Sequence, residues 1–215
     1  MFILRQSKVV YAVWLTLIAA VFAAVFIERW SMGFVAAATL IVSMLPLALA
    51  ERYEIRLPVP FLSFVVLFIF ATLFLGEAFD FYDRYWWWDI ALHGTSAVGF
   101  GLVGFVCIFI LFEGDRYAAP AWAVAFFSWC FAVAIGAAWE IFEFAMDSLF
   151  GTNMLKSGLP DTMGDLIVDV IGAAVGALSG YLYLLGLDRG GLLAWLIADF
   201  VRLNRDLFKR IDRRR

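Results

Sequence analysis

The chain has 215 residues, of which 65% are hydrophobic and 16% charged, and its mean hydropathy is +0.91. Soluble domains average about 45–50% apolar and about 25% charged residues, so a water-soluble domain could not bury this much apolar surface. The formal net charge of −3 argues against a nucleic-acid-binding protein, and a single histidine excludes a histidine-rich metal site. The composition therefore predicts an integral membrane protein.

Six apolar segments are long enough to cross a bilayer, whose hydrocarbon core of about 30 Å requires roughly 20 helical residues. They cover residues 9–27, 32–50, 59–76, 89–112, 121–146 and 162–187. The first segment resembles a signal peptide, but it is longer than the usual apolar core of about 7–15 residues, and we interpret it as an uncleaved anchor. The predicted fold class is all-α: a polytopic membrane protein with six transmembrane helices in one domain, residues 1–188.

Residues 189–215 are predicted to form a separate basic, amphipathic cytoplasmic tail helix. After Gly190 and Gly191, apolar residues recur at helical spacing. These residues are Leu193, Leu196, Ile197, Phe200, Leu203, Leu207 and Ile211. Acidic and basic residues, from Asp199 to Arg210, fill the other face. The pattern favours an interfacial helix on the inner leaflet that binds anionic lipid, and the alternative is a plain topology anchor.

The distribution of lysine and arginine predicts the orientation of the chain. Thirteen of the 16 basic residues lie at the two termini and in the loops that follow the second and fourth segments. The other three lie in the loops after the first, third and fifth segments and are Arg29, Arg84 and Lys156. Because basic residues concentrate in cytoplasmic loops, both termini are predicted to be cytoplasmic. The loops 77–88 and 147–160 then face outward from a bacterial inner (plasma) membrane.

Acidic residues occur in three consecutive predicted spans, although such residues are rare and costly within a membrane and by default indicate function. The sets are Asp89 with His93, then Glu140, Glu143 and Asp147, and finally Asp161, Asp165 and Asp169. Spacings of three and four place each set on one face of its helix. A helical rise of about 1.5 Å per residue places all three sets in the outer third of the membrane. We therefore expect them to converge.

Each of these residues also has a structural interpretation. Asp89 and Asp161 could cap their helices, and Thr162 to Asp165 fits a capping-box pattern. Asp147 could simply lie in water. Capping does not explain three acids that lie deeper in their helices, which could instead join a buried hydroxyl network. These acids are Glu140, Glu143 and Asp169, and the hydroxyls are those of Thr95, Ser96 and Ser128.

Several carboxylates close together in a low dielectric cannot all be ionised without a cation, shared protons or basic partners. The outer loops supply only Arg84 and Lys156 nearby. A divalent ion would indicate metal-assisted chemistry, and shared protons would indicate proton-coupled transport. Oxygen ligands with one imidazole suit Mg²⁺, Mn²⁺ or Ca²⁺ better than Zn or Fe. The candidate metal ligands are Asp89, His93, Glu140, Glu143, Asp147, Asp165 and Asp169, of which His93 and Glu143 are also the candidate catalytic residues.

Other patterns carry less functional information. Gly172, Gly176 and Gly180 repeat every four residues and predict a face for close helix packing. The sequence contains no Gly-x-Ser-x-Gly, no His-Glu-x-x-His and no phosphate-binding glycine loop, so serine-hydrolase, zincin and P-loop functions have no motif support. Any cofactor other than a divalent metal is left open.

Three ordered blocks resemble a known family. The first runs from Trp87 to Ser96 and contains Trp-Asp-x-x-x-His, the second runs from Trp139 to Phe144 and is followed by Asp147, and the third runs from Asp161 to Ala173. They resemble the corresponding blocks of YjdF-like bacterial inner-membrane proteins over roughly residues 60–185. A more distant likeness is to VanZ-like membrane proteins. Ile90 replaces the VanZ lysine and the arginine before the last helix is missing, so a glycopeptide-resistance role is not implied. The resemblance supports the cluster and implies no substrate.

The sequence thus predicts a membrane protein with an outward-facing carboxylate and histidine site. The leading hypothesis is a divalent-metal-dependent site that binds or acts on a polar or lipid-linked substrate at the outer leaflet. The first alternative is a proton-coupled small-molecule transporter, which would favour a polar path continuing to the cytoplasm. The second is a structural or assembly subunit whose acids receive a basic partner. Enzymatic activity and oligomeric state are left open.

Overall fold

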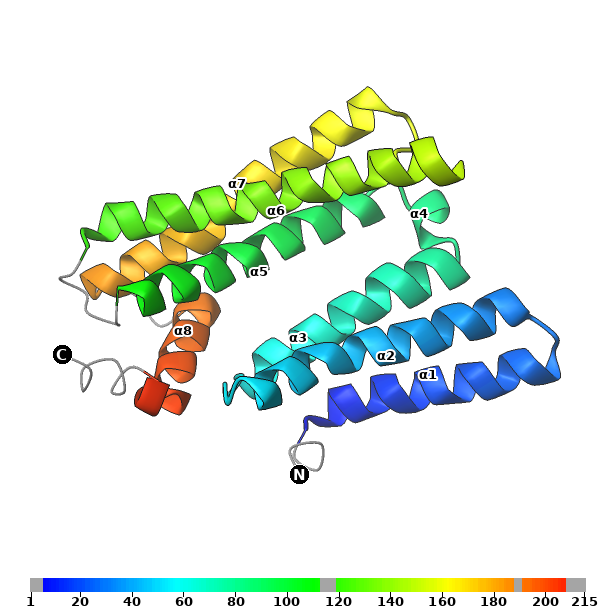
Figure 1. Cartoon of the computed structure of the whole chain (residues 1–215), viewed down its shortest axis with the longest axis horizontal. Helices are drawn as coiled ribbons and strands as arrows, with labels where there is room; N and C mark the ends of the chain where they lie inside the picture. The colour runs from blue at the N-terminus through cyan, green and yellow to red at the C-terminus, as the bar shows by residue number, and fades with distance from the viewer. Residues whose placement is uncertain (1–5, 113–118, 188–190, 208–215) are drawn as a thin grey trace. The chain divides into compact units, whose positions relative to one another are not determined.

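The computed structural model describes residues 6–112, 119–187 and 191–207, and within them the chain is all-helical. Six helical spans are long and apolar enough to cross a membrane. They are α1 (Lys8–Phe26), α2 (Trp30–Arg52), α3 (Val59–Ile69) continued by the π-helical segment η2 (Phe70–Glu77), α5 (Trp88–Leu111), α6 (Ala121–Phe150) and α7 (Leu159–Leu185). Two shorter helices are α4 (Phe81–Arg84) and α8 (Leu192–Leu203) (Figure 1). The predicted all-helical fold with six candidate membrane spans is confirmed, whereas a single transmembrane domain over residues 1–188 stays a prediction.

The helix ends around the loop between α6 and α7 differ from prediction. Helix α6 continues to Phe150 and ends at Gly151, whose φ of +67° is the left-handed conformation common after helices. Helix α7 begins at Leu159, because Pro160 is tolerated in a first helical turn. Its N-cap, Gly158, has φ +72° and ψ −133°, a conformation essentially restricted to glycine.

These boundaries change the interpretation of the terminal acids. Asp161 lies inside the first turn of α7, and Asp89 lies inside the first turn of α5, so neither occupies the N-cap position that a capping role requires. The capping interpretation is therefore wrong for both residues, including the capping box of Thr162 and Asp165. Acids in a first turn still interact favourably with the helix dipole.

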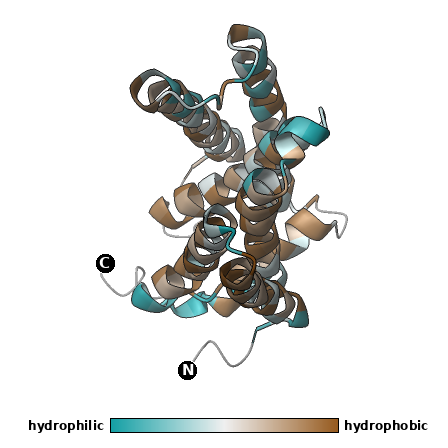
Figure 2. Ribbon diagram, turned by 90° about the vertical axis from the view of Figure 1, so that its right-hand side faces the viewer, coloured by the Kyte–Doolittle hydropathy of each residue, from teal (hydrophilic) through white to brown (hydrophobic). Residues whose placement is uncertain are grey.

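Large apolar side chains cover the exposed faces of the long helices. Only 17–33% of the apolar window of each span is buried inside the protein. Phe22, Phe34, Ile141 and Phe144 are each more than 60% exposed. Figure 2 shows hydrophobic residues along the helices and hydrophilic residues mainly in the connecting loops. Because such a surface is insoluble in water, the bilayer is the medium that the chain contacts.

The chain divides into two compact units, of which the first comprises residues 1–88 and 199–204. Its core joins α1, α2, α3 and η2 through apolar side chains that include Val10, Leu17 and Val66. Two polar contacts fix the helices within it. The Trp14 indole donates to Ser43 Oγ at 3.1 Å, and Asn204 bonds both the N–H and the carbonyl of Arg56.

The second unit comprises residues 89–198 and 205–215 and contains α5, α6 and α7. Glycines allow α5 and α7 to approach closely: a Cβ on Gly176 would lie 2.9 Å from the Cα of Gly101, and one on Gly172 would lie 2.8 Å from Ala97 Cβ. The predicted glycine packing face is confirmed. The Trp129 indole of α6 donates to the Val170 carbonyl of α7 at 3.1 Å. This packing brings the polar faces of the three helices together.

The tail is described only in part. Helix α8 confirms a short C-terminal helix, and its Asp199, expected on the polar face, is buried and pairs with Arg202. Several residues on which the tail and orientation predictions rest lie outside the described residues. In the tail these are Lys209, Arg210, Ile211 and Arg213 to Arg215, and elsewhere they are Arg5, Arg116 and Arg189. Binding of the tail to anionic lipid stays a prediction.

Candidate metal centre

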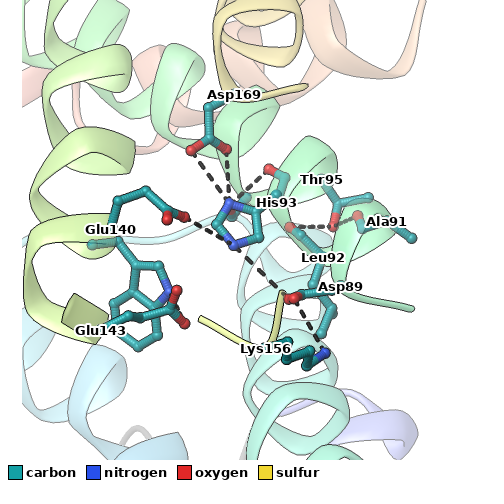
Figure 3. A network of polar contacts seen from close by, with 11 residues as sticks. Asp89, Ala91, Leu92, His93, Thr95, Glu140, Glu143, Lys156 and Asp169 are labelled. Carbon is teal, nitrogen blue, oxygen red and sulfur yellow. Dashed lines mark hydrogen bonds and ion pairs between the residues drawn. The ribbon is translucent and has the colours of Figure 1, made fainter. Parts of the chain in front are cut away.

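The polar residues of the second unit gather around the imidazole of His93 (Figure 3). His93 lies on α5, Glu140 on α6, and Asp165 and Asp169 on α7. All four side chains are buried, with exposed fractions between 2% and 7%. Asp89 lies one helical turn before His93 and is half-buried. Residues that lie far apart in the sequence, on three consecutive helices, thus contribute to one cluster.

The two ring nitrogens of His93 have different surroundings. Nδ1 lies 3.3 Å from both oxygens of Asp169. Because an ionised carboxylate only accepts hydrogen bonds, Nδ1–H is the donor. Nε2 faces Glu140 Oε1 at 3.8 Å and Asp89 Oδ1 at 3.9 Å. Metal-binding histidines in proteins are usually held in this way, with one nitrogen bonded to a carboxylate and the other facing the ion.

Asp169 is itself positioned by α6. A Cβ at Gly136 would lie 2.8 Å from the Asp169 carboxyl carbon, so only glycine leaves room for this carboxylate. The Trp129 bond to Val170 holds α7 against α6 one residue further along. Asp169 therefore contacts Nδ1 of His93, and its role as a metal ligand stays a prediction.

Glu140 is a buried acid whose side chain accepts no hydrogen bond from the residues that the structure describes. Its side chain is 4% exposed, and neither carboxylate oxygen accepts a hydrogen bond from any residue that the structure describes. The Thr162 side chain interacts with it electrostatically but not with hydrogen-bond geometry. Leaving a buried polar group unsatisfied costs about 1–3 kcal/mol, and more when the group is charged. Both oxygens of Glu140 therefore lack the partner that burial demands.

A divalent ion would fit this arrangement. His93, Glu140 and Asp165 each offer one ligand atom, and the three atoms lie within 4.8 Å of one another. Neighbouring ligand atoms around an ion bound at about 2.1 Å are roughly 3 Å apart, so Nε2 and Oε1 need to approach by only about 0.8 Å. The set combines one imidazole nitrogen with carboxylate oxygens. Asp169 contacts the other nitrogen of the same imidazole, as carboxylates commonly do beside metal-binding histidines.

A second set of ligand atoms lies beside the first. Asp89, Asp161 and Asp165 each offer an oxygen, and these atoms also lie within 4.8 Å of one another. Asp165 belongs to both sets. The Lys156 ammonium, from the loop between α6 and α7, donates to Asp89 Oδ2 at 3.3 Å. The loop thus supplies a positive charge at the edge of the cluster.

The two remaining predicted site residues have other partners. Glu143 is half-buried, and its Oε1 accepts a hydrogen bond from the Trp139 indole at 3.0 Å. Asp147 accepts from the Thr152 hydroxyl and from the backbone N–H groups of Met154 and Leu155. Neither residue belongs to the two ligand sets. Asp147 therefore organises its own loop, and its role as a metal ligand stays untested.

Three contributors to the site were not among the residues predicted for it. Lys156 lies in a loop, where no periodicity indicates which way a side chain faces. The sequence places Asp161 in the third acidic set, but a capping role also explains it, and it is not among the predicted ligands. Gly136 lies one helical turn before Glu140, and that spacing on the same face is a signal that could have identified it.

Comparison with known proteins identifies relatives but no activity. A family model described as "Predicted membrane protein (DUF2238)" matches residues 10–186. A protein of Thermotoga maritima described as "Uncharacterized protein" is 29% identical over 104 residues, which are 48% of this chain and 53% of the relative. The chain therefore spans about half the length of that curated relative. No solved structure matches.

Proposed function

We propose that the buried cluster is a divalent-cation centre. The chain that contains it belongs to the DUF2238 family of predicted membrane proteins. His93 Nε2, Glu140 and Asp165 would hold the ion, with Mg²⁺, Mn²⁺ or Ca²⁺ the best suited. Asp169 would orient His93. The observation that carries the proposal is the buried Glu140 carboxylate, because neither of its oxygens accepts a hydrogen bond from a described residue and Oε1 faces His93 Nε2 at 3.8 Å.

The proposal extends to a substrate class and a location. A divalent ion at this position would act as a Lewis acid that polarises an oxygen of a bound group. Glu143, which is half-buried and lies beside the cluster, would accept a proton from such a group. The charge asymmetry of the loops supports an outward-facing centre, and the resemblance to YjdF-like proteins supports a bacterial inner membrane. The ligand would then be a polar or lipid-linked molecule of the outer leaflet.

Proton-coupled transport is the rival function, and the geometry of the helices supports it less. A transporter needs polar groups that continue through the membrane. In the far halves of α6 and α7 the hydroxyls of Ser128 and Ser179 bond carbonyls of their own helices, Val124 O and Val175 O. Phe105 of α5 packs against Gly180 of α7. The described residues thus provide no polar path beyond the cluster.

Metal binding is tested by equilibrium dialysis of the purified protein, without an affinity tag, against Mn²⁺. Wild-type protein should bind Mn²⁺, and Glu140→Gln and His93→Gln should each weaken binding by at least about tenfold, the equivalent of 1.4 kcal/mol. Asp80→Asn is the matched control, because that exposed carboxylate lies in the other unit and pairs with nearby Arg84. Absence of binding to wild-type protein would refute the centre. Equal weakening by the Asp80 control would show that surface charge alone attracts the ion.

A further inference from the structure

The cluster contains two sets of ligand atoms that share one carboxylate. Asp165 is 4% exposed and belongs both to the set with His93 and Glu140 and to the set with Asp89 and Asp161. A carboxylate has two oxygens, so Asp165 can face two cation positions at once. In two-metal sites the ions lie about 3.5–4 Å apart and are commonly joined by such a shared ligand. The two sets therefore define two candidate cation positions that share Asp165.

The two positions differ in the positive charge available to them. At the first, neither buried Glu140 oxygen accepts a hydrogen bond from a described residue, and among the ion pairs of the described residues Oε1 faces only the His93 imidazole, at 3.8 Å. At the second, the Lys156 ammonium lies 3.3 Å from Asp89 Oδ2 and also attracts the Asp161 carboxylate. A lysine side chain is a compact positive charge on a flexible stem. The second position thus already has a cation that belongs to the protein.

The loop holds Lys156 in this place. Asp147 accepts hydrogen bonds from Thr152 Oγ1 at 2.7 Å, from Met154 N at 2.7 Å and from Leu155 N at 3.0 Å. Lys156 follows directly, with a φ of +43° that side-chain-bearing residues adopt rarely. Such a conformation costs on the order of 1 kcal/mol or more and persists only where its surroundings impose it. Asp147 is therefore a positioning residue that acts through Lys156.

We propose that Lys156 determines how many divalent ions the centre holds. Its ammonium fills the second position, so the wild-type protein binds one ion, at His93, Glu140 and Asp165. A second ion binds to Asp89, Asp161 and Asp165 when the ammonium is removed. This inference rests on the proposed metal centre and adds to it a built-in cation that sets its stoichiometry.

The test counts Mn²⁺ ions in tag-free protein by equilibrium dialysis and examines their electron paramagnetic resonance spectrum. Wild-type protein should bind one ion and show an isolated Mn²⁺ signal. Lys156→Met keeps an unbranched apolar side chain of similar length without the charge. It should bind two ions and show the spectrum of an exchange-coupled pair. Binding of the second ion should be at least about tenfold tighter than in wild type.

Three variants complete the design. Lys156→Arg keeps the charge and should bind one ion. Lys156→Gln should behave as Lys156→Met does, which provides a second readout if the methionine variant is not stable. Asp147→Asn weakens the loop bonds but keeps Lys156, so its second ion should bind more weakly than in Lys156→Met and more tightly than in wild type.

The outcomes separate this inference from the proposed function. One ion in wild type and one in both neutral variants would overturn the role of Lys156 and leave the metal centre intact. Two ions in wild type would overturn that role as well. No ion in any of the proteins would overturn the metal centre itself.

Discussion

Glu140→Gln should change the stability of the protein in opposite directions with and without a divalent ion. Glutamine keeps the size and shape of the side chain but removes its negative charge. In the presence of chelator, the wild-type carboxylate is buried with both oxygens unpartnered and lies near the Asp165 and Asp169 carboxylates. The substitution relieves that arrangement.

The size of each effect follows from the geometry. Glutamine is still a buried polar side chain, so the substitution relieves only the extra cost of burying a charge beside other carboxylates, which is on the order of 1–3 kcal/mol. At about 2–4 °C per kcal/mol for a chain of this size, chelated Glu140→Gln should unfold roughly 2–12 °C above wild type. Free Mn²⁺ at 100 times its Kd should stabilise wild type by about 2.7 kcal/mol. The variant has lost one of three ligands and should gain much less, so its advantage should shrink or reverse.

The assay is thermal unfolding in detergent, followed by tryptophan fluorescence, in chelator and then in excess Mn²⁺. The diagnostic result is that the stability gain from Mn²⁺ is large in wild type and small in Glu140→Gln. Asp80→Asn should follow wild type under both conditions. If Glu140→Gln unfolds below wild type by a similar amount in both conditions, Glu140 is a structural residue and the reasoning from its unpartnered oxygens is refuted.

Three further predictions concern the position, the chemistry and the orientation of the site. Gly136→Ala should displace the Asp169 carboxylate and reduce the stabilisation by Mn²⁺, although no ligand is changed. Gly164→Ala, whose added Cβ would have nothing within 4 Å, should leave the stabilisation by Mn²⁺ unchanged. Equal responses of the two variants in the unfolding assay would contradict this prediction. Acidification should reduce Mn²⁺ stabilisation, because protons compete with the ion for carboxylates and imidazole; a response that is constant between neutral and acid pH would argue against these ligands. A reporter fused after Arg215 should be cytoplasmic and one inserted near Gly151 should be outside, and inverted activities would remove the outer-leaflet location.

The six spans could be predicted from hydropathy because a backbone in lipid must satisfy its own hydrogen bonds, and a helix does so. Their ends could not be predicted equally well. Asp147 and Ser148 are polar, and yet α6 continues through them to Phe150. Pro160 lies in the first turn of α7, so this helix begins earlier than the apolar pattern indicates. These shifts moved Asp161 from a cap position into a helical turn, where its side chain joins Asp89 and Asp165.

The convergence of the acids could be predicted, but the task of each could not. Helical spacing and depth indicated that the three sets would meet. Which oxygen faces which nitrogen of His93 depends on side-chain conformation, and that separates the orienting Asp169 from Glu140. Lys156 comes from a loop whose path is set by hydrogen bonds to Asp147, and no periodicity describes such a path.

The account depends most on an ion bound to His93, and the sequence allows this to be measured without ambiguity. His93 is the single histidine of the chain. Electron spin echo envelope modulation of Mn²⁺ bound to tag-free protein detects imidazole nitrogen coupled to the ion. The account predicts coupling from one imidazole nitrogen in wild-type protein, lost in His93→Gln and retained in Asp80→Asn. Mn²⁺ that binds without imidazole coupling would contradict a centre built on His93.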